Sequence, residues 1–344
     1  MNGIPPDPSD ERYSRQIRFA EIGEEGQRRI GRSRVAVVGC GGLGSAQSEI
    51  LARAGVGFLR IIDRDYIDWT NLQRQWLFDE QNARNAMPKA AAAAARLREI
   101  NSSIEIDPAI TDLTPSNIDD LLGDVELIMD GTDNFETRFL INDYAVSRNI
   151  PWIYGAAVGS YGVKMPVIPG KTCCLRCIIP DLPGGVQQSC ETAGILAPST
   201  TVIGALQAAD AIKILSGHID EISSRMTVVD VWTGDLMQVN RGERNPDCPT
   251  CVRREFSFLE GKRRAPISLC GRNAVQIHDR RRPIDLKQLA EQLQGIGTVR
   301  MNEFALRAEI APYELTVFPD GRAIIKGTTD VGVAKSIYAR YVGN

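Results

Sequence analysis

A glycine-rich segment is the first part of this sequence whose residue types and spacing indicate chemistry. The apolar run RVAVVG leads directly into Gly39-Cys40-Gly41-Gly42-Leu43-Gly44, and a helical pattern follows as far as Ala54. Glycines at such a junction let backbone N–H groups approach a phosphate at the start of the helix, where the helix dipole favours negative charge. Asp63 ends the next apolar run, 19 positions after Gly44, and a carboxylate there can bind ribose hydroxyls. The pattern predicts a nucleotide site, with NAD, FAD and ATP all compatible.

Three further groups of polar residues favour ATP. They are Asn71, Arg74 and Gln75 in NLQRQ, Lys89 in MPK, and Asp130 with Asp133 in DGTDN. Hydride transfer needs none of them, whereas Arg and Lys neutralise the charge of a triphosphate. A carboxylate at the end of a buried strand can hold Mg²⁺ against the phosphates. Each residue alone is explained as solvated surface or as a helix cap, so the hypothesis of an ATP site depends on the set.

Two C-x-x-C pairs indicate a metal site. Cys174 and Cys177 form the first pair, and Cys248 and Cys251 form the second, with 70 residues between the pairs. Four thiolates suit tetrahedral Zn²⁺, and a site with no open coordination position is structural. Cys173 adjoins the first pair, but the spacing to Cys177 favours Cys174 as the ligand. We favour zinc over disulfides because a cytosolic chain keeps its thiols for metals or catalysis.

The sequence around the remaining cysteines indicates less about their roles. Cys190 lies in the loop QQSCETAGILAP, where a thiol is available for chemistry, although a small apolar side chain explains it equally well. Cys40 is expected to be a packing residue, and Cys270 to lie in a strand near the C-terminus. The two histidines, His218 and His278, suggest no catalytic triad.

Strands and helices alternate along the first half of the chain. Apolar runs at residues 34–39, 58–65, 104–110, 125–131 and 151–155 alternate with helical patterns at 43–54, 89–100 and 135–149. This rhythm predicts an α/β fold with a Rossmann-like, doubly wound, largely parallel sheet. The later segments read as β-rich runs, a helix from about residue 199 to 215, and two strands that extend the sheet.

A basic segment, residues 260–266, is expected to be a hinge. It would separate a nucleotide-binding domain, residues 1–259, from a small α+β tail, residues 267–344. The tail reads as β, α, β, β, β, α, and the segment ELTVFPDGRAIIKG predicts a hairpin with Pro-Asp-Gly at its turn. The sequence does not indicate the function of this tail.

Composition narrows the class of protein. The 344 residues are 43% hydrophobic, which excludes a disordered or fibrous chain. The net charge of -3 arises from 40 basic and 43 acidic residues, so no patch for nucleic acid or a membrane surface stands out. With no long apolar run and a polar, proline-rich N-terminus, we expect a cytoplasmic protein.

The motifs RYSRQI, GCGGLG, IIDRD, NLQRQ, PK and DGTDN occur in the order typical of the ubiquitin-activating superfamily. Over roughly residues 11–255 the chain resembles its bacterial adenylyltransferases of the MoeB, ThiF and HesA type. The resemblance implies an enzyme that uses ATP and Mg²⁺ to adenylate the C-terminal glycine of a small ubiquitin-like carrier protein. It also implies a structural Zn²⁺. The carrier would end in Gly-Gly, like MoaD or ThiS. Once activated, it would take part in sulfur transfer for cofactor biosynthesis or a related thiolation, with a separate protein as the sulfur donor.

The resemblance also implies roles for individual residues. The expected nucleotide-binding residues are Gly39, Gly41, Gly42, Gly44, Asp63, Asp65, Asn71, Arg74, Gln75, Lys89, Asp130 and Asn134. Among them, Asp130 would be the magnesium-binding catalytic aspartate, and Arg74 and Lys89 would contact the phosphates. Arg15 of RYSRQI would reach into the neighbouring subunit's pocket, which implies a homodimer. Cys190 would accept the carrier as a thioester or take part in an acyl-disulfide.

Alternative functions remain open at this point. An activating enzyme for protein conjugation through a Cys190 thioester has the same motifs. An NAD- or FAD-dependent oxidoreductase would share the glycine segment, but it has no place for NLQRQ, Lys89 or the cysteine pairs. A degenerate nucleotide-binding scaffold is expected to have lost Arg74, Lys89 or Asp130, and all three are present.

Overall fold

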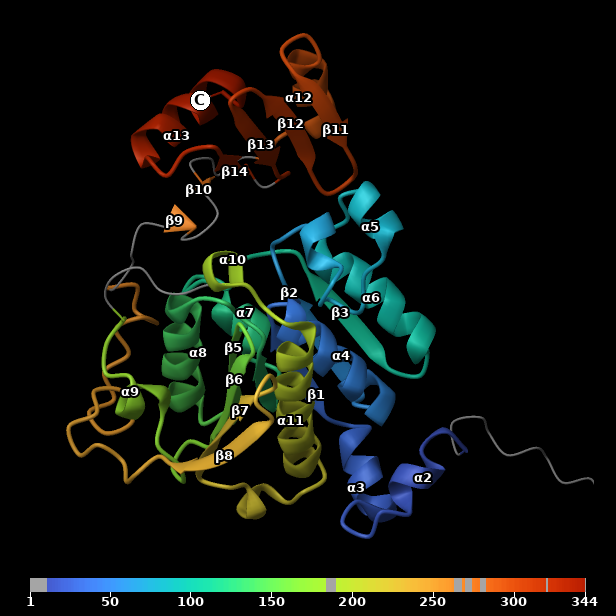
Figure 1. The fold of residues 1–344 in the computed structure, drawn as a ribbon, viewed down its shortest axis with the longest axis vertical. Helices are drawn as coiled ribbons and strands as arrows, with labels where there is room; N and C mark the ends of the chain where they lie inside the picture. Colours follow the sequence, from blue (N-terminus) through green and yellow to red (C-terminus); the bar gives the residue numbers. More distant parts are fainter. Residues whose placement is uncertain are drawn as a thin grey trace, which may run out of the picture. The chain divides into compact units, whose positions relative to one another are not determined.

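The structure is a computed structural model that describes residues 11–183, 190–262, 268–269, 274–278, 283–319 and 321–343. It divides into two compact units, Met1–Arg263 and Arg264–Asn344 (Figure 1). The division falls inside the basic segment 260–266. Within the described residues, no helix combines the length and the apolar character needed to cross a membrane.

The first unit is built on one eight-stranded sheet with the order β3-β2-β1-β4-β5-β6-β7-β8. Its strands are β1 (Arg34–Val38), β2 (Phe58–Ile62), β3 (Glu105–Ala109), β4 (Leu127–Asp130), β5 (Trp152–Val158), β6 (Tyr161–Val167), β7 (Arg225–Asp230) and β8 (Asp235–Asn240). The strands β1 to β5 are parallel, and β5 to β8 continue the sheet as antiparallel neighbours. The predicted doubly wound, largely parallel sheet with a β-rich extension is confirmed.

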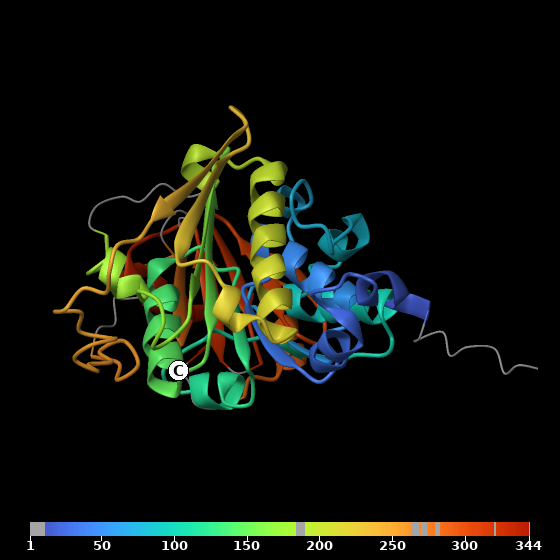
Figure 2. The ribbon, with the colours of Figure 1, turned by 90° about the horizontal axis from the view of Figure 1, so that it is seen from below.

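Helices cover both faces of this sheet. The helices described in the first unit are α2 (Ser14–Ile17), α3 (Gly23–Ile30), α4 (Gly42–Ala54), α5 (Glu80–Arg84), α6 (Lys89–Ile100), α7 (Ile118–Leu122), α8 (Phe135–Arg148), α9 (Leu175–Ile178), α10 (Cys190–Ala193) and α11 (Ala197–Leu215). Successive strand residues point to opposite faces. Val35 and Val37 therefore join a core with α4, α6 and α11, whereas Ala36 and Val38 join a core with α7 and α8. Figure 2 shows the yellow-green α11 and the green α8 on opposite sides of the strands.

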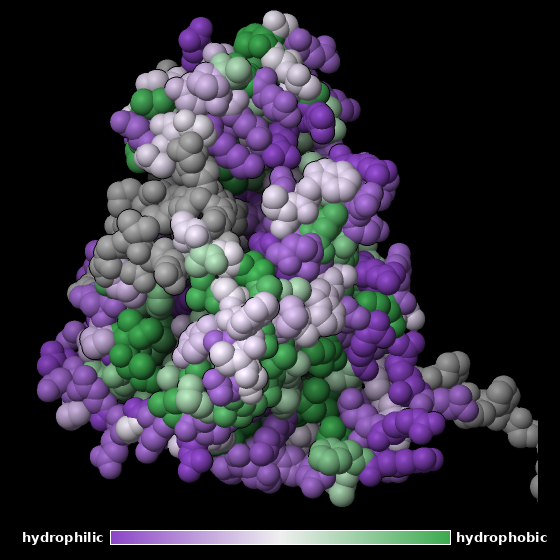
Figure 3. All heavy atoms as spheres, viewed as in Figure 1, coloured by the Kyte–Doolittle hydropathy of each residue, from purple (hydrophilic) through white to green (hydrophobic). Residues whose placement is uncertain are grey.

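Several apolar side chains of α11 are only partly buried. These are Val202, Leu206, Ile212 and Ile214. Figure 3 shows hydrophobic surface gathered over this helix. The rest of α11 packs against α4, β5 and β6 through fully buried residues such as Ile203 and Ala208.

The second unit has an antiparallel sheet with the order β11-β12-β13-β14-β10-β9. Its elements are β9 (Ser268–Leu269), β10 (Ala274–His278), α12 (Leu286–Leu293), β11 (Thr298–Met301), β12 (Leu306–Ile310), β13 (Tyr313–Val317), β14 (Arg322–Lys326) and α13 (Val331–Tyr341). Both helices share one apolar core with the sheet. The predicted hairpin is present as β13 and β14, although Asp320 of its turn lies outside the described residues, as does Cys270.

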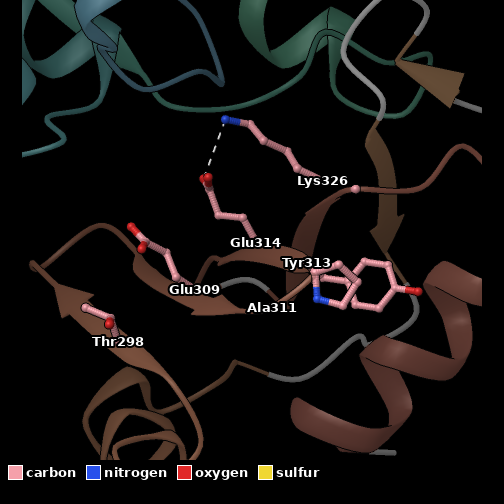
Figure 4. Close-up of a pocket in the computed structure, with 8 residues that line it drawn as sticks. Thr298, Glu309, Ala311, Tyr313, Glu314 and Lys326 are labelled. Carbon is pink, nitrogen blue, oxygen red and sulfur yellow. Dashed lines mark ion pairs between the residues drawn. The ribbon is translucent and has the colours of Figure 1, made fainter.

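A hollow in this tail unit lies beside β13 and β14 (Figure 4). Glu309, Glu314 and Lys326 line it, and Lys326 Nζ lies 3.5 Å from a carboxylate oxygen of Glu314. It contains none of the residues predicted to bind a nucleotide.

Three glycines determine how the ends of β1 and β4 meet the start of α4. A Cβ added to Gly44 would lie 1.8 Å from the carbonyl oxygen of Gly39, and one added to Gly131 would lie 2.3 Å from the same oxygen. Gly39 itself has a φ of 87°, which L side chains rarely adopt. Backbone atoms cannot move aside to make room for a Cβ as the end of a flexible side chain can, so these positions require glycine.

We expect Gly44→Ala to lower the free energy of unfolding by about 3 kcal/mol because the new methyl group overlaps the backbone. Gly41→Ala is the matched control. Its Cβ would meet only Gln75 Nε2, at 3.9 Å, and we expect a loss of about 1 kcal/mol or less. Urea unfolding of both variants checks this expectation, and equal losses would contradict it.

Candidate nucleotide-binding site

The predicted site lies where the carboxyl ends of β1, β2 and β4 meet. Val38 is in register with Ile62 of β2 and with Asp130 of β4. The Gly39 amide donates to the Ile62 carbonyl at 2.7 Å, and the Gly131 amide donates to the Val38 carbonyl at 2.8 Å. The glycine segment is thereby held between both neighbouring strands. In an open α/β sheet, ligands bind in the crevice at this edge.

Asp63 is tied to the glycine segment by its side chain. Its two carboxylate oxygens accept hydrogen bonds from the amides of Cys40 and Asp65, both at 2.7 Å. Burial raises the pKa of Asp63, and the positive charge of Lys89 opposes this shift. A carboxylate has about four acceptor positions, so about two remain for donors such as ribose hydroxyls.

Lys89 joins the same network from the start of α6. Its Nζ lies 3.1 Å from Oδ2 of Asp65, and its amide donates to the Asp65 carbonyl at 2.9 Å. The residue is only 5% exposed. The structure therefore brings together Asp63, Asp65 and Lys89, which the sequence predicted as one site.

Gln75 and Gly41 lie side by side, and the surroundings of both residues fit a bound ligand. Gln75 is buried, and its Oε1 has no hydrogen-bond partner within the described residues. A buried acceptor without a partner is costly. The nearest atom to a Cβ on Gly41 would be Gln75 Nε2 at 3.9 Å, so the absence of a side chain there leaves open space. A nucleotide beside Gly41 would fill this space and reach the Gln75 amide.

Of the four other predicted residues, three make local contacts and one is exposed. Asn71 Oδ1 accepts from the Asp68 amide at 3.0 Å, and Arg74 Nη1 donates to the Thr70 carbonyl at 2.8 Å. Asn134 caps α8, and Arg15 is an exposed residue of α2. Within the described residues, none of these four side chains hydrogen-bonds to the glycine segment.

Asp130 is completely buried at the end of β4, and its carboxylate is saturated. Oδ1 accepts from the Thr132 amide at 2.9 Å and from the Thr132 hydroxyl at 2.7 Å. Oδ2 accepts from Arg138 Nε at 3.1 Å and from the Gly155 amide at 3.3 Å. All four acceptor positions are filled. Asp130 has the oxygen atoms that Mg²⁺ prefers, but no acceptor position is open to the ion unless one donor withdraws.

Sequence reasoning missed Arg138, which pairs with Asp130 inside the protein. Burial lowers the pKa of Arg138, but Asp130, Tyr154 and Asp133 together outweigh this effect, so the pKa is raised overall. The guanidinium also donates to the carbonyls of Thr132 at 2.7 Å and Gly155 at 2.8 Å. A signal existed, since Asn134 caps α8 and the side chain of a residue in the first helical turns points back toward the helix start.

Two buried glutamines support the same strand end and were also missed. Gln47 Nε2 and Gln207 Nε2 each donate to the Asp130 carbonyl at 2.9 Å. Gln47 also donates to Gln207 Oε1 at 2.6 Å. Gln207 Nε2 also donates to the Ile153 carbonyl of β5 at 2.9 Å, so these contacts join α4 and α11 to β4 and β5. Their sequence signal is a lone polar residue on the buried side of an apolar helix.

The two C-x-x-C pairs come together as a cluster. The four sulfurs of Cys174, Cys177, Cys248 and Cys251 lie within 4.8 Å of one another. Neighbouring sulfurs are 3.4 to 3.9 Å apart, whereas a disulfide needs about 2.05 Å. Zn–S bonds of about 2.3 Å in a tetrahedron give S–S separations of about 3.8 Å. The cluster therefore fits a zinc ion.

Helix α8 contacts the segments that carry these cysteines. Asp143 accepts from the Thr250 hydroxyl and from the Phe258 amide, both at 2.9 Å, and Asn142 accepts from the Leu175 amide at 2.8 Å. Burial raises the pKa of Asp143, and the Thr250 hydrogen bond opposes this shift. Cys173 is directed elsewhere, with its Sγ 3.4 Å from the Gly242 carbonyl oxygen. This arrangement agrees with Cys174, not Cys173, as the member of the cluster.

Cys190 is the first residue of α10. Its side chain lies outside the described residues, as does the preceding segment 184–189. Cys40 is fully buried, and burial raises the pKa of its thiol.

Comparison with known proteins agrees with this geometry. The model of the ThiF family matches residues 13–250. The sulfur carrier protein ThiS adenylyltransferase of Bacillus subtilis is 43% identical over 338 residues, covering 96% of this chain and 99% of that protein. The SAMP-activating enzyme E1 of Haloferax volcanii is 35% identical over 242 residues, covering 70% and 88%. The crystal structure of E. coli MccB with MccA-N7isoASN matches with a TM-score of 0.62 and 26% identity, covering 72% of this chain and 76% of MccB.

The fold and the strand-end site thus define an E1-like α/β enzyme with a small antiparallel tail. The chain belongs to the ThiF family. It is a nucleotidyltransferase of the ThiF and MoeB type.

Replacing Arg138 with Met would leave the buried Asp130 carboxylate without its cationic partner. We expect Arg138→Met to lower the free energy of unfolding by about 3–5 kcal/mol. Adding Asp130→Asn removes the unpaired charge, so the double variant should be more stable than Arg138→Met. Urea unfolding of the wild type, both single variants and the double variant measures the coupling. A coupling energy near zero would contradict the pairing.

Proposed function

We propose that this enzyme adenylates the C-terminal glycine of a small ubiquitin-like sulfur-carrier protein that ends in Gly-Gly. The observation that carries the proposal is the 43% identity to the ThiS adenylyltransferase of Bacillus subtilis. It extends over 99% of that protein and 96% of this chain, so the tail unit is included. The activated glycine would then serve sulfur transfer, with a separate protein as the sulfur donor.

The proposed reaction needs little covalent chemistry from side chains. A carboxylate oxygen of the carrier's terminal glycine attacks the α-phosphorus of ATP, and the bond from that phosphorus to the bridging oxygen of pyrophosphate breaks. The products are an acyl-adenylate and pyrophosphate. Positioning and neutralisation of the phosphate charge supply the rate.

The geometry supports specific roles within this reaction. Asp63, with about two free acceptor positions, would bind the ribose hydroxyls. The space beside Gly41 would receive the nucleotide, and Gln75 Oε1 would gain a partner. Lys89 would neutralise phosphate charge from its buried position beside Asp65. Asn71 and Arg74 would turn from their local contacts toward the phosphates, while Asn134 would remain at the start of α8.

Two metal ions belong to the proposal. Mg²⁺ would be held by Asp130 against the phosphates, where it neutralises charge. Zn²⁺ would be bound by Cys174, Cys177, Cys248 and Cys251 in a structural role, which the sulfur spacing supports. Thiols kept for a metal also favour a cytoplasmic location.

A homodimer is the proposed assembly. Arg15 is exposed on the short helix α2, where it is free to reach a neighbouring subunit's nucleotide. The half-buried apolar residues of α11 would contribute to the surface for such an association (Figure 3). We further propose that residues 1–259 form the adenylation domain, that 260–266 are a hinge, and that 267–344 form a separate tail domain.

A second candidate function is activation of a modifier for protein conjugation, with Cys190 forming a thioester to it. The 35% identity to the SAMP-activating enzyme E1 favours this candidate. The higher identity to the ThiS adenylyltransferase and its near-complete coverage rank sulfur transfer first.

ATP–pyrophosphate exchange tests the proposed adenylation. We expect exchange with wild-type enzyme only when a carrier ending in Gly-Gly is added, and none with the same carrier lacking its terminal glycine. Asp130→Asn should lower exchange by at least about 100-fold while nucleotide binding persists, because the charge on the phosphates is no longer compensated in the transition state.

Exchange at the wild-type rate in Asp130→Asn would exclude the role of Asp130. To separate the two candidate fates of the carrier, Cys190→Ala should be assayed for thiocarboxylate formation. Full activity would exclude a covalent role for Cys190.

Elemental analysis tests the zinc site. We expect about one zinc per chain in the wild type, and a large loss of bound zinc in Cys248→Ser because only three thiolates remain. Cys173→Ser is the matched control and should retain the metal, since Cys173 is adjacent to the cluster but directed at Gly242. Loss of zinc in Cys173→Ser but not in Cys248→Ser would overturn the assignment.

A further inference from the structure

His218 joins two parts of the first unit that are far apart in the sequence. It follows the end of α11, and both nitrogens of its ring have close partners. Nδ1 lies 2.9 Å from Oε1 of Glu221, and Nε2 lies 2.7 Å from the carbonyl oxygen of Glu21. Glu21 belongs to the turn between α2 and α3. The imidazole therefore bridges the end of α11 and the N-terminal segment.

Both ring nitrogens face oxygens that only accept hydrogen bonds. Glu221 is ionised near neutral pH, and its hydrogen bond with His218 lowers its pKa further. A neutral imidazole has one N–H, so its other nitrogen would direct a lone pair at one of the two oxygens. Only the imidazolium donates to both. The bridge is therefore complete only while His218 carries the second proton.

The turn between α2 and α3 has few other attachments. Its amides donate within the turn, as those of Ile22 and Gly23 do to the Phe19 carbonyl at 2.9 and 3.0 Å. In the part of the chain that the structure describes, the contact with His218 is the one hydrogen bond that links residues 18–22 to a residue beyond Gly26. The side chain of Ile22 packs against the core. Without the bridge, the turn would be held mainly by this apolar contact.

The two helices that flank the turn have contacts of their own, which do not depend on a proton. Helix α3 packs against the end of α11 (Figure 1). A Cβ on Gly26 would lie only 3.1 Å from the Cβ of Ser216. Helix α2 is attached to the end of α4, where Gln16 Nε2 donates to the Ala54 carbonyl at 3.0 Å. Loss of the proton on His218 therefore affects the turn and leaves both helices attached.

The other charged groups on these elements keep their charge near neutral pH. They are Lys171, Lys213, Asp220 and Glu221 around the end of α11, and Glu21, Glu25, Arg28 and Arg29 on the turn and α3. Histidine is the side chain whose ordinary pKa falls in this range. Glu221 raises the pKa of His218 and the Glu21 carbonyl adds to this shift, whereas desolvation and Lys213 oppose it.

We propose that His218 is a proton-dependent clamp, which fixes the α2–α3 turn to the end of α11 when its ring is protonated and releases the turn when the ring loses a proton. The partners of the ring raise its pKa in the folded protein. The clamp is therefore fully formed below the ordinary histidine pKa of about 6.5, and it opens as the pH rises through the raised value.

The clamp has a consequence for Arg15, and this consequence rests on the proposed function. Arg15 is an exposed residue of α2, a helix that ends four residues before Glu21. A released turn widens the range of positions open to α2 and to the Arg15 side chain. The proposed contribution of Arg15 to the neighbouring subunit's nucleotide site would therefore be strongest when His218 is protonated.

Imidazole NMR spectra test the protonation of the ring, because the chain has only two histidines, His218 and His278. In the full chain with ¹⁵N-labelled histidine, we expect both nitrogens of His218 to stay protonated above about pH 6.5. Glu221→Gln should lower this pKa because the carboxylate charge is lost, and His278→Gln assigns the signals. A neutral His218 ring at pH 6, or a pKa that Glu221→Gln leaves unchanged, would overturn the proposal.

Hydrogen exchange with mass spectrometry measures the release of the turn. Between pH 6 and pH 8.5, we expect exchange of a peptide covering residues 18–24, corrected for the chemical rate, to become about fivefold faster in the wild type. His218→Gln never carries the charge, so its corrected exchange should be faster already at pH 6 and should not change with pH. His278→Gln is the matched control and should behave like the wild type. A pH dependence that persists in His218→Gln, or that the wild type lacks, would exclude the clamp.

ATP–pyrophosphate exchange tests the consequence for the nucleotide site separately. The ratio of the wild-type rate to the His218→Gln rate should fall severalfold between pH 6 and pH 8.5. The same ratio at both pH values would overturn the link between the clamp and Arg15. If the wild type catalyses no exchange at all, the proposed function fails, whereas the imidazole spectra and hydrogen exchange still decide whether the clamp exists.

Discussion

The close approach of three backbone segments around the Gly39 carbonyl determines the rest of the site. Gly44 at the start of α4 and Gly131 after β4 both lie so near this oxygen that neither tolerates a Cβ. The contact brings the start of α4 and the end of β4 to one point. Asp63 and Asp130 occupy the ends of the strands on either side of β1. Because the packing involves main-chain atoms, it fixes both carboxylates with little freedom.

These two carboxylates have similar positions but different hydrogen bonding. Asp63 receives two backbone amides, which leaves acceptor capacity for a ligand's hydroxyls. Asp130 receives four donors, one of them a buried guanidinium. A buried charge pair of this kind contributes little net stability, although breaking it is costly. Its value to the site is the orientation of the carboxylate that it maintains.

Much of this arrangement could be predicted from the sequence, because it depends on local patterns. The alternation of apolar runs and helical segments predicted the parallel sheet, and the C-x-x-C spacing predicted the cysteine cluster. Gln47 and Gln207 were missed because their partner Asp130 is distant in the chain, 83 and 77 residues away. Arg138 is only eight residues from Asp130, and it was missed because an Arg in a helix is usually a surface residue. The contacts of Arg74 and Asn71 were not predictable either, since capping and turn geometry satisfy their side chains locally.

Helix α8 connects the nucleotide site to the cysteine cluster. Arg138 contacts Asp130 near the start of the helix, and Asn142 and Asp143, about one turn later, contact the segments that carry the cysteines. A change in the cluster that shifted α8 would move the guanidinium that orients Asp130. The cysteine cluster can therefore affect the nucleotide site without supplying any ligand to it. The length of chain between the two C-x-x-C pairs is consistent with this role, since the pairs anchor two distant loops to the same helix.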